Sequence, residues 1–267
     1  MPALLLAAAL AAAAGCYHAP PGTAPAGASG TVIVPPDYDP SRAYPVVEIL
    51  PPTGSTADAM FQIYLSHVGL GALARETPER QLAALLPYLV PDTGVYRTPP
   101  RFLVILARGR GSRDDYGTAE AWSRTVERYE RQVRADLRAV AASHRVDATR
   151  FIVAGFSMGG DLAWALTLRN PDLLHGAIVM ASRATYRPAA GEADMARLAD
   201  ARFFLTMGTR DEEVRRRLAR AAADLLTRTG IAHRFRMIEG AGHEPAPVGT
   251  FAEALRYVLG GGGTAPN

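Results

Sequence analysis

Short apolar runs alternate with amphipathic stretches along most of the chain. Apolar or closely alternating runs of this length, bounded by glycine, proline or polar residues, are typical of buried strands. On this basis, strands are expected at Thr31–Val34, Val46–Leu50, Phe102–Leu106, Phe151–Ala154, Ala177–Met180, Phe203–Met207 and Arg234–Ile238. Continuous apolar runs indicate strands that are buried on both faces, as in a mostly parallel sheet.

Between the predicted strands, apolar residues recur every three or four positions, as they do on one face of a helix. The first long stripe of this kind consists of Trp122, Val126, Tyr129, Val133, Leu137 and Val140. Helices are expected at about Trp122–Ala142, in the segment after Ser157, at Glu213–Thr229 and at Val248–Leu259. The alternation predicts the α/β class, with a doubly wound, mostly parallel sheet flanked by helices.

Length and composition favour one sizeable domain. The 267 residues are 48% hydrophobic and 21% charged, which is ordinary for a globular chain that can bury its own core. We expect this domain to span residues 31–260 and a flexible tail to follow it at residues 261–267.

The most informative motif follows the predicted strand Phe151–Ala154. It reads Gly-Phe-Ser-Met-Gly-Gly from Gly155 onward, and a helix-compatible pattern continues beyond it. Strand, Gly-x-Ser-x-Gly and helix in this order describe a nucleophile elbow, a tight turn that exposes a serine hydroxyl. Gly155 and Gly159 are small enough to let the strand and the helix pass closely. Ser157 is therefore the candidate nucleophile.

A serine hydroxyl is a poor nucleophile at neutral pH and needs a base and a group that orients this base. Asp211 follows the predicted strand Phe203–Met207, at the strand end where open α/β sheets place functional groups. His243 lies in a glycine-rich loop after the last predicted strand. Asp211 is the candidate acid and His243 the candidate base. Glu212 and Glu213, which open the next helix, are local rivals of Asp211.

With an elbow at Ser157 and with Asp211 and His243 following in that order, the segment from about Pro45 to Leu259 resembles an α/β-hydrolase of the serine esterase type. The lead-in at residues 146–151 is similar to compact feruloyl esterase-like and polyhydroxybutyrate depolymerase-like proteins and to the carboxylesterase/phospholipase group. The resemblance implies that a Ser-His-Asp triad hydrolyses a carboxylic ester through an acyl-serine intermediate. It implies no cofactor, and no His/Cys/carboxylate cluster in the sequence has metal-ligand spacing.

Other functions remain open beside hydrolysis of a small-molecule or polymeric ester. An acyltransferase, a thioesterase or a peptidase would use the same three residues. A non-catalytic surface binding protein on a hydrolase fold is a further alternative, suggested by the prolines Pro51 and Pro52 in the loop expected to bind the oxyanion.

An acyl-transferring serine enzyme also needs backbone donors for the oxyanion, one from the residue after the nucleophile and one from the loop after an earlier strand. Met158 is the first candidate donor. Where relatives usually carry His-Gly and further glycines, this chain has Pro51-Pro52-Thr53-Gly54. Proline has no backbone N–H. Thr53 is therefore the second candidate donor, with Gly54 as its alternative.

Two connections govern access to Ser157. The connection Ala181–Ala201, where many relatives insert a cap, is short, so no large cap domain is expected. The connection Ser55–Pro100 is long, and helical pieces are expected in it at Ala57–Val68 and Pro78–Leu89. Phe61 and Tyr64, together with Met60 and Leu65, are candidates to line an acyl pocket. The alternative is that this apolar stripe packs in the core.

The net charge of +3 and the isoelectric point near 9.2 come entirely from arginine, since the chain has no lysine. Arg108, Arg110 and Arg113 leave a predicted strand at its carboxyl end and are candidate substrate contacts, because guanidinium groups match carboxylates and phosphates. The alternative is that they form salt bridges with Asp114, Asp115 and Glu120. A nucleic-acid partner is not expected, because the arginines lack aromatic interleaving and a binding motif.

The N-terminal residues resemble a bacterial lipoprotein signal peptide. An apolar run, Ala3–Ala14, is too short to span a membrane and is followed by Gly15 and Cys16, the one cysteine of the chain. We expect a signal peptide at residues 1–15, a lipidated Cys16, and a flexible linker at residues 16–30 that tethers the hydrolase to a membrane surface in the cell envelope. The alternatives are plain secretion, a mis-set translation start and a cytosolic protein.

Overall fold

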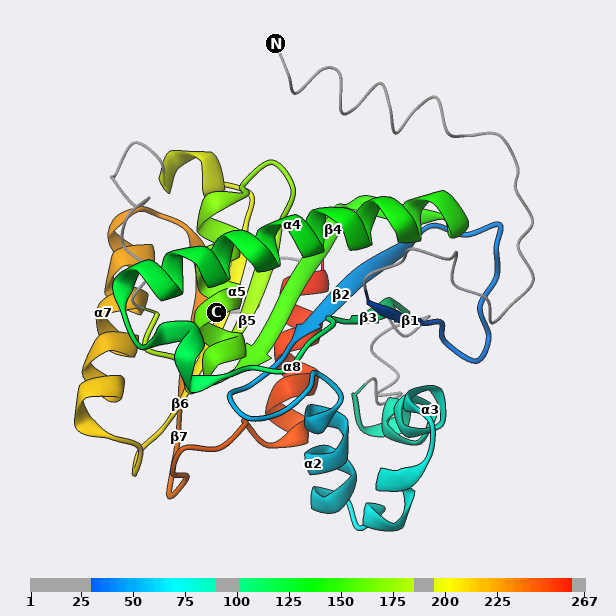
Figure 1. The fold of residues 1–267 in the computed structure, drawn as a ribbon, viewed down its shortest axis with the longest axis horizontal. Coiled ribbons are helices and arrows are strands. Elements are labelled where there is room, and N and C mark those ends of the chain that lie inside the picture. Colours follow the sequence, from blue (N-terminus) through cyan, green and yellow to red (C-terminus); the bar gives the residue numbers. More distant parts are fainter. Residues whose placement is uncertain (1–29, 90–100, 185–194, 261–267) are drawn as a thin grey trace.

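The computed structural model describes residues 30–89, 101–184 and 195–260, and its centre is a sheet of seven strands (Figure 1). The strand order is β1-β3-β2-β4-β5-β6-β7. β1 pairs with β3 in antiparallel fashion, and the other neighbouring strands are parallel. Cys16, the expected signal peptide, nearly all of the expected linker and the tail at residues 261–267 lie outside the described residues.

All of the predicted strands are present. They are β1 Thr31–Ile33, β2 Tyr44–Leu50, β3 Leu103–Leu106, β4 Val146–Phe156, β5 Gly176–Met180, β6 Arg202–Gly208 and β7 Ala232–Ile238. The largest difference from the prediction is in β4, which begins at Val146 and not at Phe151. Its first five residues, Val-Asp-Ala-Thr-Arg, form no apolar run; they are partly or fully exposed, and Asp147 binds Thr149 and Arg150.

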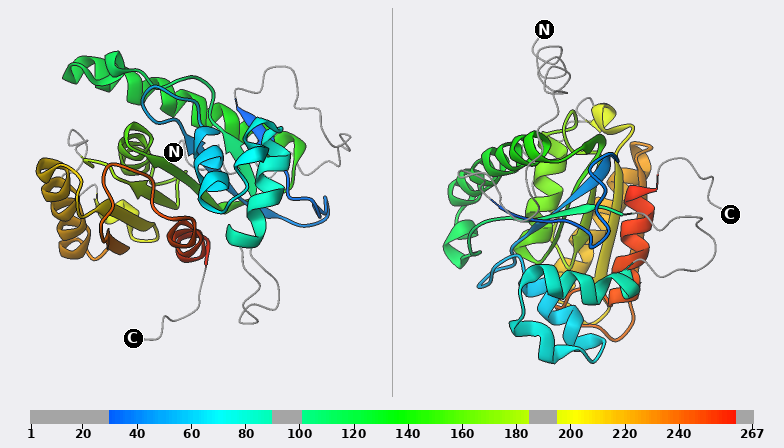
Figure 2. Two further views of the ribbon diagram at one scale, coloured as in Figure 1. Left: turned by 90° about the horizontal axis from the view of Figure 1, so that it is seen from below. Right: turned by 90° about the vertical axis from the view of Figure 1, so that its right-hand side faces the viewer.

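Helices cover both faces of the sheet (Figure 2). They are α2 Ala59–His67, α3 Pro78–Leu89, α4 Ala119–Ser143, α5 Met158–Arg169, α7 Glu213–Arg228 and α8 Val248–Leu259. The described chain also contains short 3₁₀ turns at Gly71–Arg75, Arg113–Tyr116 and Ala196–Leu198. α4 starts before the predicted Trp122 because the Thr118 hydroxyl caps it by accepting from the N–H of Ala121.

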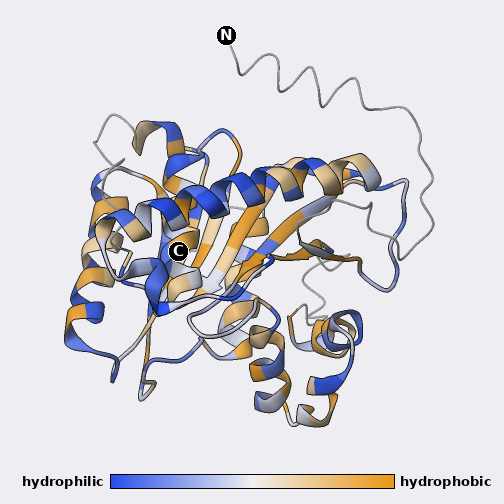
Figure 3. Ribbon diagram, in the orientation of Figure 1, coloured by the Kyte–Doolittle hydropathy of each residue, from blue (hydrophilic) through white to orange (hydrophobic). Residues whose placement is uncertain are grey.

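Side chains that alternate along each strand form two separate cores. On β2, Val46 and Leu50 pack toward α4, α5 and α7, whereas Val47 and Ile49 pack toward α2, α3 and α8. Figure 3 shows the corresponding apolar strands between helices that have one apolar and one polar side. The doubly wound architecture predicted from the sequence is confirmed.

The parallel arrangement brings the carboxyl ends of β2 to β7 to one edge of the sheet. The loops that leave this edge carry Thr53, Arg110, Ser157, Asp211 and His243. Within the described residues, no helix combines the length and the apolar character that a bilayer crossing requires.

Candidate active site

Ser157 lies at a sharp turn between β4 and α5. Its backbone has φ 56° and ψ −119°. Residues other than glycine rarely adopt a positive φ of this kind. The N–H of Ser157 donates to the carbonyl of Met180 at 2.9 Å, and its carbonyl accepts from the N–H of Asp161 at 2.9 Å. These bonds hold the strained residue at the carboxyl edge of the sheet, with its side chain partly exposed.

Two glycines make this turn possible. A Cβ atom on Gly155 would lie 2.3 Å from the backbone of Gly159, and a Cβ atom on Gly159 would lie 2.5 Å from the carbonyl oxygen of Leu50. Strand and helix therefore pass at backbone contact distance, as the Gly-x-Ser-x-Gly pattern predicts.

Ser157, His243 and Asp211 meet in one chain of contacts. Oγ of Ser157 lies 2.9 Å from Nε2 of His243, and Nδ1 of His243 lies 2.8 Å from Oδ2 of Asp211. The Asp211 side chain is fully buried, whereas 36% of the His243 side chain is exposed. The structure thus brings together three residues that are far apart in the sequence, with a buried carboxylate at one end and an accessible hydroxyl at the other.

Asp211, and not its neighbours in the sequence, contacts the imidazole. Its Oδ1 accepts the N–H of Glu212 at 2.7 Å, which fixes the carboxylate at the start of α7. The carboxylate of Glu212 is exposed and pairs with Arg215 at 3.1 Å. Glu213 is the first residue of the helix and is exposed.

The loop that carries His243 is tied to the loop after β6. The N–H of Arg210 donates to the carbonyl of Ala241 at 2.8 Å, and the N–H of Gly240 donates to the Thr209 hydroxyl at 2.9 Å. The ring of Phe156, the residue before Ser157, lies 5.1 Å from the His243 ring. These contacts limit how far the imidazole can move from Ser157.

The loop after β2 approaches the elbow from the other side. Gly54 donates its N–H to the carbonyl of Gly111 at 2.7 Å, while the Thr53 N–H makes no hydrogen bond to any residue that the structure describes. Met158 is the first residue of α5, where backbone N–H groups have no acceptor within the helix. The amides of Thr53 and Met158 are therefore available as oxyanion donors, whereas that of Gly54 is occupied.

Comparison with known proteins assigns the chain to a family. The phospholipase/carboxylesterase family matches residues 112–254, more than half of the chain. The chain belongs to this family. It is a carboxylic ester hydrolase, which confirms the resemblance to serine esterases. Among curated proteins, none matches.

Solved structures similar to this phospholipase/carboxylesterase family member include several esterases. A ferulic acid esterase from Anaeromyces mucronatus, in complex with ferulic acid, has a TM-score of 0.60 and 15% identity over 88% of this chain and 87% of its own. A fungal esterase from Rhizomucor miehei has a TM-score of 0.56 and 16% identity over 85% of this chain and 78% of its own. Esterase PE8 has a TM-score of 0.55 and 17% identity over 86% of this chain and 99% of its own. At such identities the likeness establishes the fold alone.

Phe61 and Tyr64 do not line an accessible acyl pocket in this family member, and the prediction that they do so is wrong. Both side chains are buried, as are Met60 and Leu65, and they pack in the core between α2, α3 and α8. The Tyr64 hydroxyl donates to Sδ of Met180 at 3.5 Å, and burial raises the pKa of Tyr64 far above its ordinary value. The apolar stripe of α2 therefore supports the sheet beneath the elbow.

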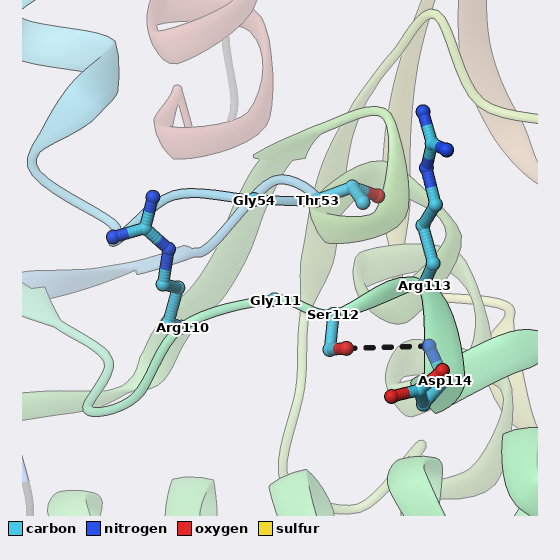
Figure 4. Close-up of a pocket in the computed structure, with 7 residues that line it drawn as sticks. All are labelled: Thr53, Gly54, Arg110, Gly111, Ser112, Arg113 and Asp114. Carbon is cyan, nitrogen blue, oxygen red and sulfur yellow. Dashed lines mark hydrogen bonds between the residues drawn. The ribbon is translucent and has the colours of Figure 1, made fainter.

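The exposed arginines that follow β3 lie close to Thr53. Arg110 and Arg113 line an open hollow together with Thr53 and Gly54 (Figure 4), and Arg108 is exposed outside this lining. The alternative in which these arginines pair with nearby acids fails for Asp115, which is buried and pairs with Arg128 at 2.8 Å.

Sequence reasoning missed Asp161, in the first turn of α5. Its carboxylate is buried and accepts from the Ser182 hydroxyl at 2.6 Å and from the N–H of Arg183 at 2.8 Å. Burial raises the pKa of Asp161, and these hydrogen bonds act in the opposite direction. An acidic residue in an otherwise apolar helix, four positions after the serine, is the signal that could have indicated this role. Asp161 ties the loop after β5 to the elbow helix.

Proposed function

We propose that this chain hydrolyses carboxylic esters through an acyl-serine intermediate, with Ser157 as the nucleophile, His243 as the general base and Asp211 as the acid that orients the imidazole. One observation carries the proposal: hydrogen-bonding distances connect the Ser157 hydroxyl through the imidazole to a buried carboxylate. The strained backbone of Ser157 supports it, because such strain is concentrated at functional positions.

The contacts of His243 support one direction of proton transfer. A carboxylate can only accept hydrogen bonds, so the imidazole proton lies on Nδ1, next to Asp211, and Nε2 is free to accept. Nε2 takes the Ser157 proton as Oγ bonds to the ester carbonyl carbon, and it returns this proton to the leaving alkoxide, which departs as the alcohol. Water, deprotonated by the same Nε2, then attacks the acyl carbon; the acyl–Oγ bond breaks, Nε2 returns the proton to Oγ of Ser157, and the carboxylic acid is released.

The negative charge that develops on the carbonyl oxygen needs fixed donors. We assign this role to the backbone N–H groups of Met158 and Thr53. The two loops that carry them are in contact, because Gly159 passes against the carbonyl oxygen of Leu50, at the end of β2. Donors that are in place before the reaction stabilise the transition state without reorganisation.

Covalent labelling tests the nucleophile directly. A fluorophosphonate should modify the wild-type chain at Ser157, and Ser157→Ala should prevent both this labelling and the turnover of a p-nitrophenyl ester series of increasing acyl length. Labelling without turnover would contradict hydrolysis and favour transfer of the acyl group to an acceptor other than water. Absence of labelling would contradict the catalytic role and favour a binding protein on a hydrolase fold.

We further propose that the chain is anchored to a membrane surface in the cell envelope through a lipid on Cys16. The proposal rests on the apolar run at residues 3–14 and on the linker-like composition after the cysteine. Expression of the full chain in a bacterium should place the wild type in the membrane fraction and Cys16→Ser in the soluble fraction. A Cys16→Ser chain that stayed with the membranes would refute the lipid anchor.

A further inference from the structure

An open hollow of about 580 Å³ lies beside the proposed oxyanion loop. Its lining comes from two segments, residues 53–54 after β2 and residues 110–114 after β3 (Figure 4). The segments are joined by a parallel bridge between Thr53 and Gly111 and by the hydrogen bond from Gly54 to Gly111. The hollow therefore shares a wall with the loop that we assign to oxyanion binding.

The hollow also lies close to the nucleophile elbow. A Cβ atom on Gly111 would lie 2.3 Å from the carbonyl oxygen of Pro52 and 2.7 Å from Cε of Met158, the residue that follows Ser157. Ser157 and His243 themselves are not part of the lining. A substrate whose scissile carbonyl lies at Ser157 would reach the hollow with a more distant part, past Thr53.

The charges of the lining favour an anion. The side chains of Arg110 and Arg113 are exposed, and neither forms an ion pair with another residue that the structure describes. Figure 4 shows the two guanidinium groups at opposite ends of the lining, that of Arg110 on the Gly54 side and that of Arg113 on the Thr53 side, while the carboxylate of Asp114 points away from both. The neighbouring carboxylate of Asp115 is already paired with Arg128. The lining thus carries two guanidinium groups and one carboxylate, that of Asp114, which leaves it with a net positive charge.

We infer that this hollow binds a carboxylate or phosphate group carried by the ester substrate, remote from the bond that is cleaved. The inference rests on the proposed function and narrows its substrate class to anionic esters. A guanidinium group offers several N–H donors in a planar fork, which matches the oxygens of either anion. Thr53, whose hydroxyl lies 3.1 Å from the Tyr116 hydroxyl, also lines the hollow.

Matched ester pairs test the inference on both sides of the ester bond. On the acyl side, mono-p-nitrophenyl adipate is compared with p-nitrophenyl hexanoate. On the alcohol side, meta-acetoxybenzoate and meta-acetoxyphenyl phosphate are compared with phenyl acetate. The variant is Arg110→Ala with Arg113→Ala. Its control is Arg217→Ala with Arg220→Ala, which removes the same charge from exposed positions on α7.

We expect the wild type to have a higher kcat/KM for the anionic member of at least one pair. In the Arg110/Arg113 variant, the ratio of anionic to neutral kcat/KM should fall about tenfold, the effect of losing a charge-assisted hydrogen bond. The control should keep the wild-type ratio. Equal ratios in wild type and variant, or an equal fall in the control, would overturn the inference.

A binding measurement separates this inference from the proposed function. Phenyl phosphate, which carries no carboxylic ester, is titrated calorimetrically into the wild type, the variant and the control. Binding that is lost only in the Arg110/Arg113 variant supports the anion site even if no ester is turned over. A different outcome would refute the anion site and leave the proposed function standing. In that outcome the wild type hydrolyses neutral esters, and phenyl phosphate binds the wild type and the Arg110/Arg113 variant alike.

Discussion

Oδ2 of Asp211 lies 2.8 Å from Nδ1 of His243, and the Asp211 side chain is shielded completely from water. This contact holds the imidazole in the tautomer that can accept the Ser157 proton. Asp211→Asn should therefore lower kcat for a p-nitrophenyl ester by about three to four orders of magnitude, as expected when an orienting acid loses its charge.

The neighbouring glutamate provides the control for this variant. Glu212→Gln removes an exposed carboxylate one position away and should change kcat by less than about threefold, because its partner is Arg215 and not the imidazole. If Glu212→Gln lowered kcat as much as Asp211→Asn, the acid would be assigned to the wrong residue.

The backbone N–H of Thr53 can be tested by removing it. Thr53→Pro eliminates the donor, whereas Thr53→Ala keeps it and removes the hydroxyl that contacts Tyr116 together with the γ-methyl group. Losing one oxyanion donor costs about 3 kcal/mol, so Thr53→Pro should lower kcat by about a hundredfold or more. Thr53→Ala should keep most of the activity, with circular dichroism confirming that both variants are folded. Equal activities for the two variants would assign the donor to another residue.

Close backbone packing at the elbow makes Gly155 sensitive to a single methyl group. Gly155→Ala would place Cβ 2.3 Å from the backbone of Gly159, and we expect it to lower the free energy of unfolding by about 1–3 kcal/mol, as overpacking does. Gly249, in the first turn of α8, has no neighbouring atom within 4 Å of such a Cβ. Gly249→Ala should leave stability unchanged or raise it by up to about 1 kcal/mol. Urea denaturation of both variants would reveal this difference in sign.

Glu48 is buried in the centre of β2 and faces Asp136 on α4, whose Oδ1 accepts the N–H of Gly30 at 2.9 Å. Burial, followed by the charge of Asp136, raises the pKa of Glu48 well above its ordinary value. The folded state therefore keeps a proton that the unfolded chain loses above a pKa of about 4.3. The contribution of this group to stability is complete below that pH and is lost as the pH rises through the folded pKa.

Glu48→Gln should remove this dependence. At pH 8 the free energy of unfolding of the variant should exceed that of the wild type by about 1 kcal/mol or more, and the two should converge in acid. Glu127→Gln, on the exposed face of α4, is the control and should follow the wild-type curve. Parallel stability curves for Glu48→Gln and the wild type between pH 4 and pH 9 would contradict the raised pKa.

The strands and most helices could be predicted from local pattern alone. Each parallel strand buries both faces, so its apolar run is continuous, and α3 Pro78–Leu89 matches its predicted bounds. The largest boundary differences, at β4 and α4, are places where an element extends beyond its apolar run. There the structure depends on partners that lie elsewhere in the sequence or on a capping hydroxyl.

The candidate triad could be predicted because its chemistry requires particular residue types in recognisable settings. Ser157 needs small neighbours at a turn, and Asp211 and His243 each follow a strand of a parallel sheet, whose carboxyl ends must meet at one edge. Their catalytic roles stay a prediction until the labelling and turnover experiments are done.

The sequence by itself determined the alternation of elements, the elbow and the order of the three candidate catalytic residues, because these depend on local periodicity and on backbone sterics. Only the tertiary structure decided that Phe61 and Tyr64 lie in the core, that Asp115 pairs with Arg128 and leaves Arg110 and Arg113 lining the hollow, and that Asp161 ties a distant loop to the elbow. The physical reason is that an apolar or charged side chain specifies what kind of partner it needs, whereas which partner it meets depends on how distant segments pack.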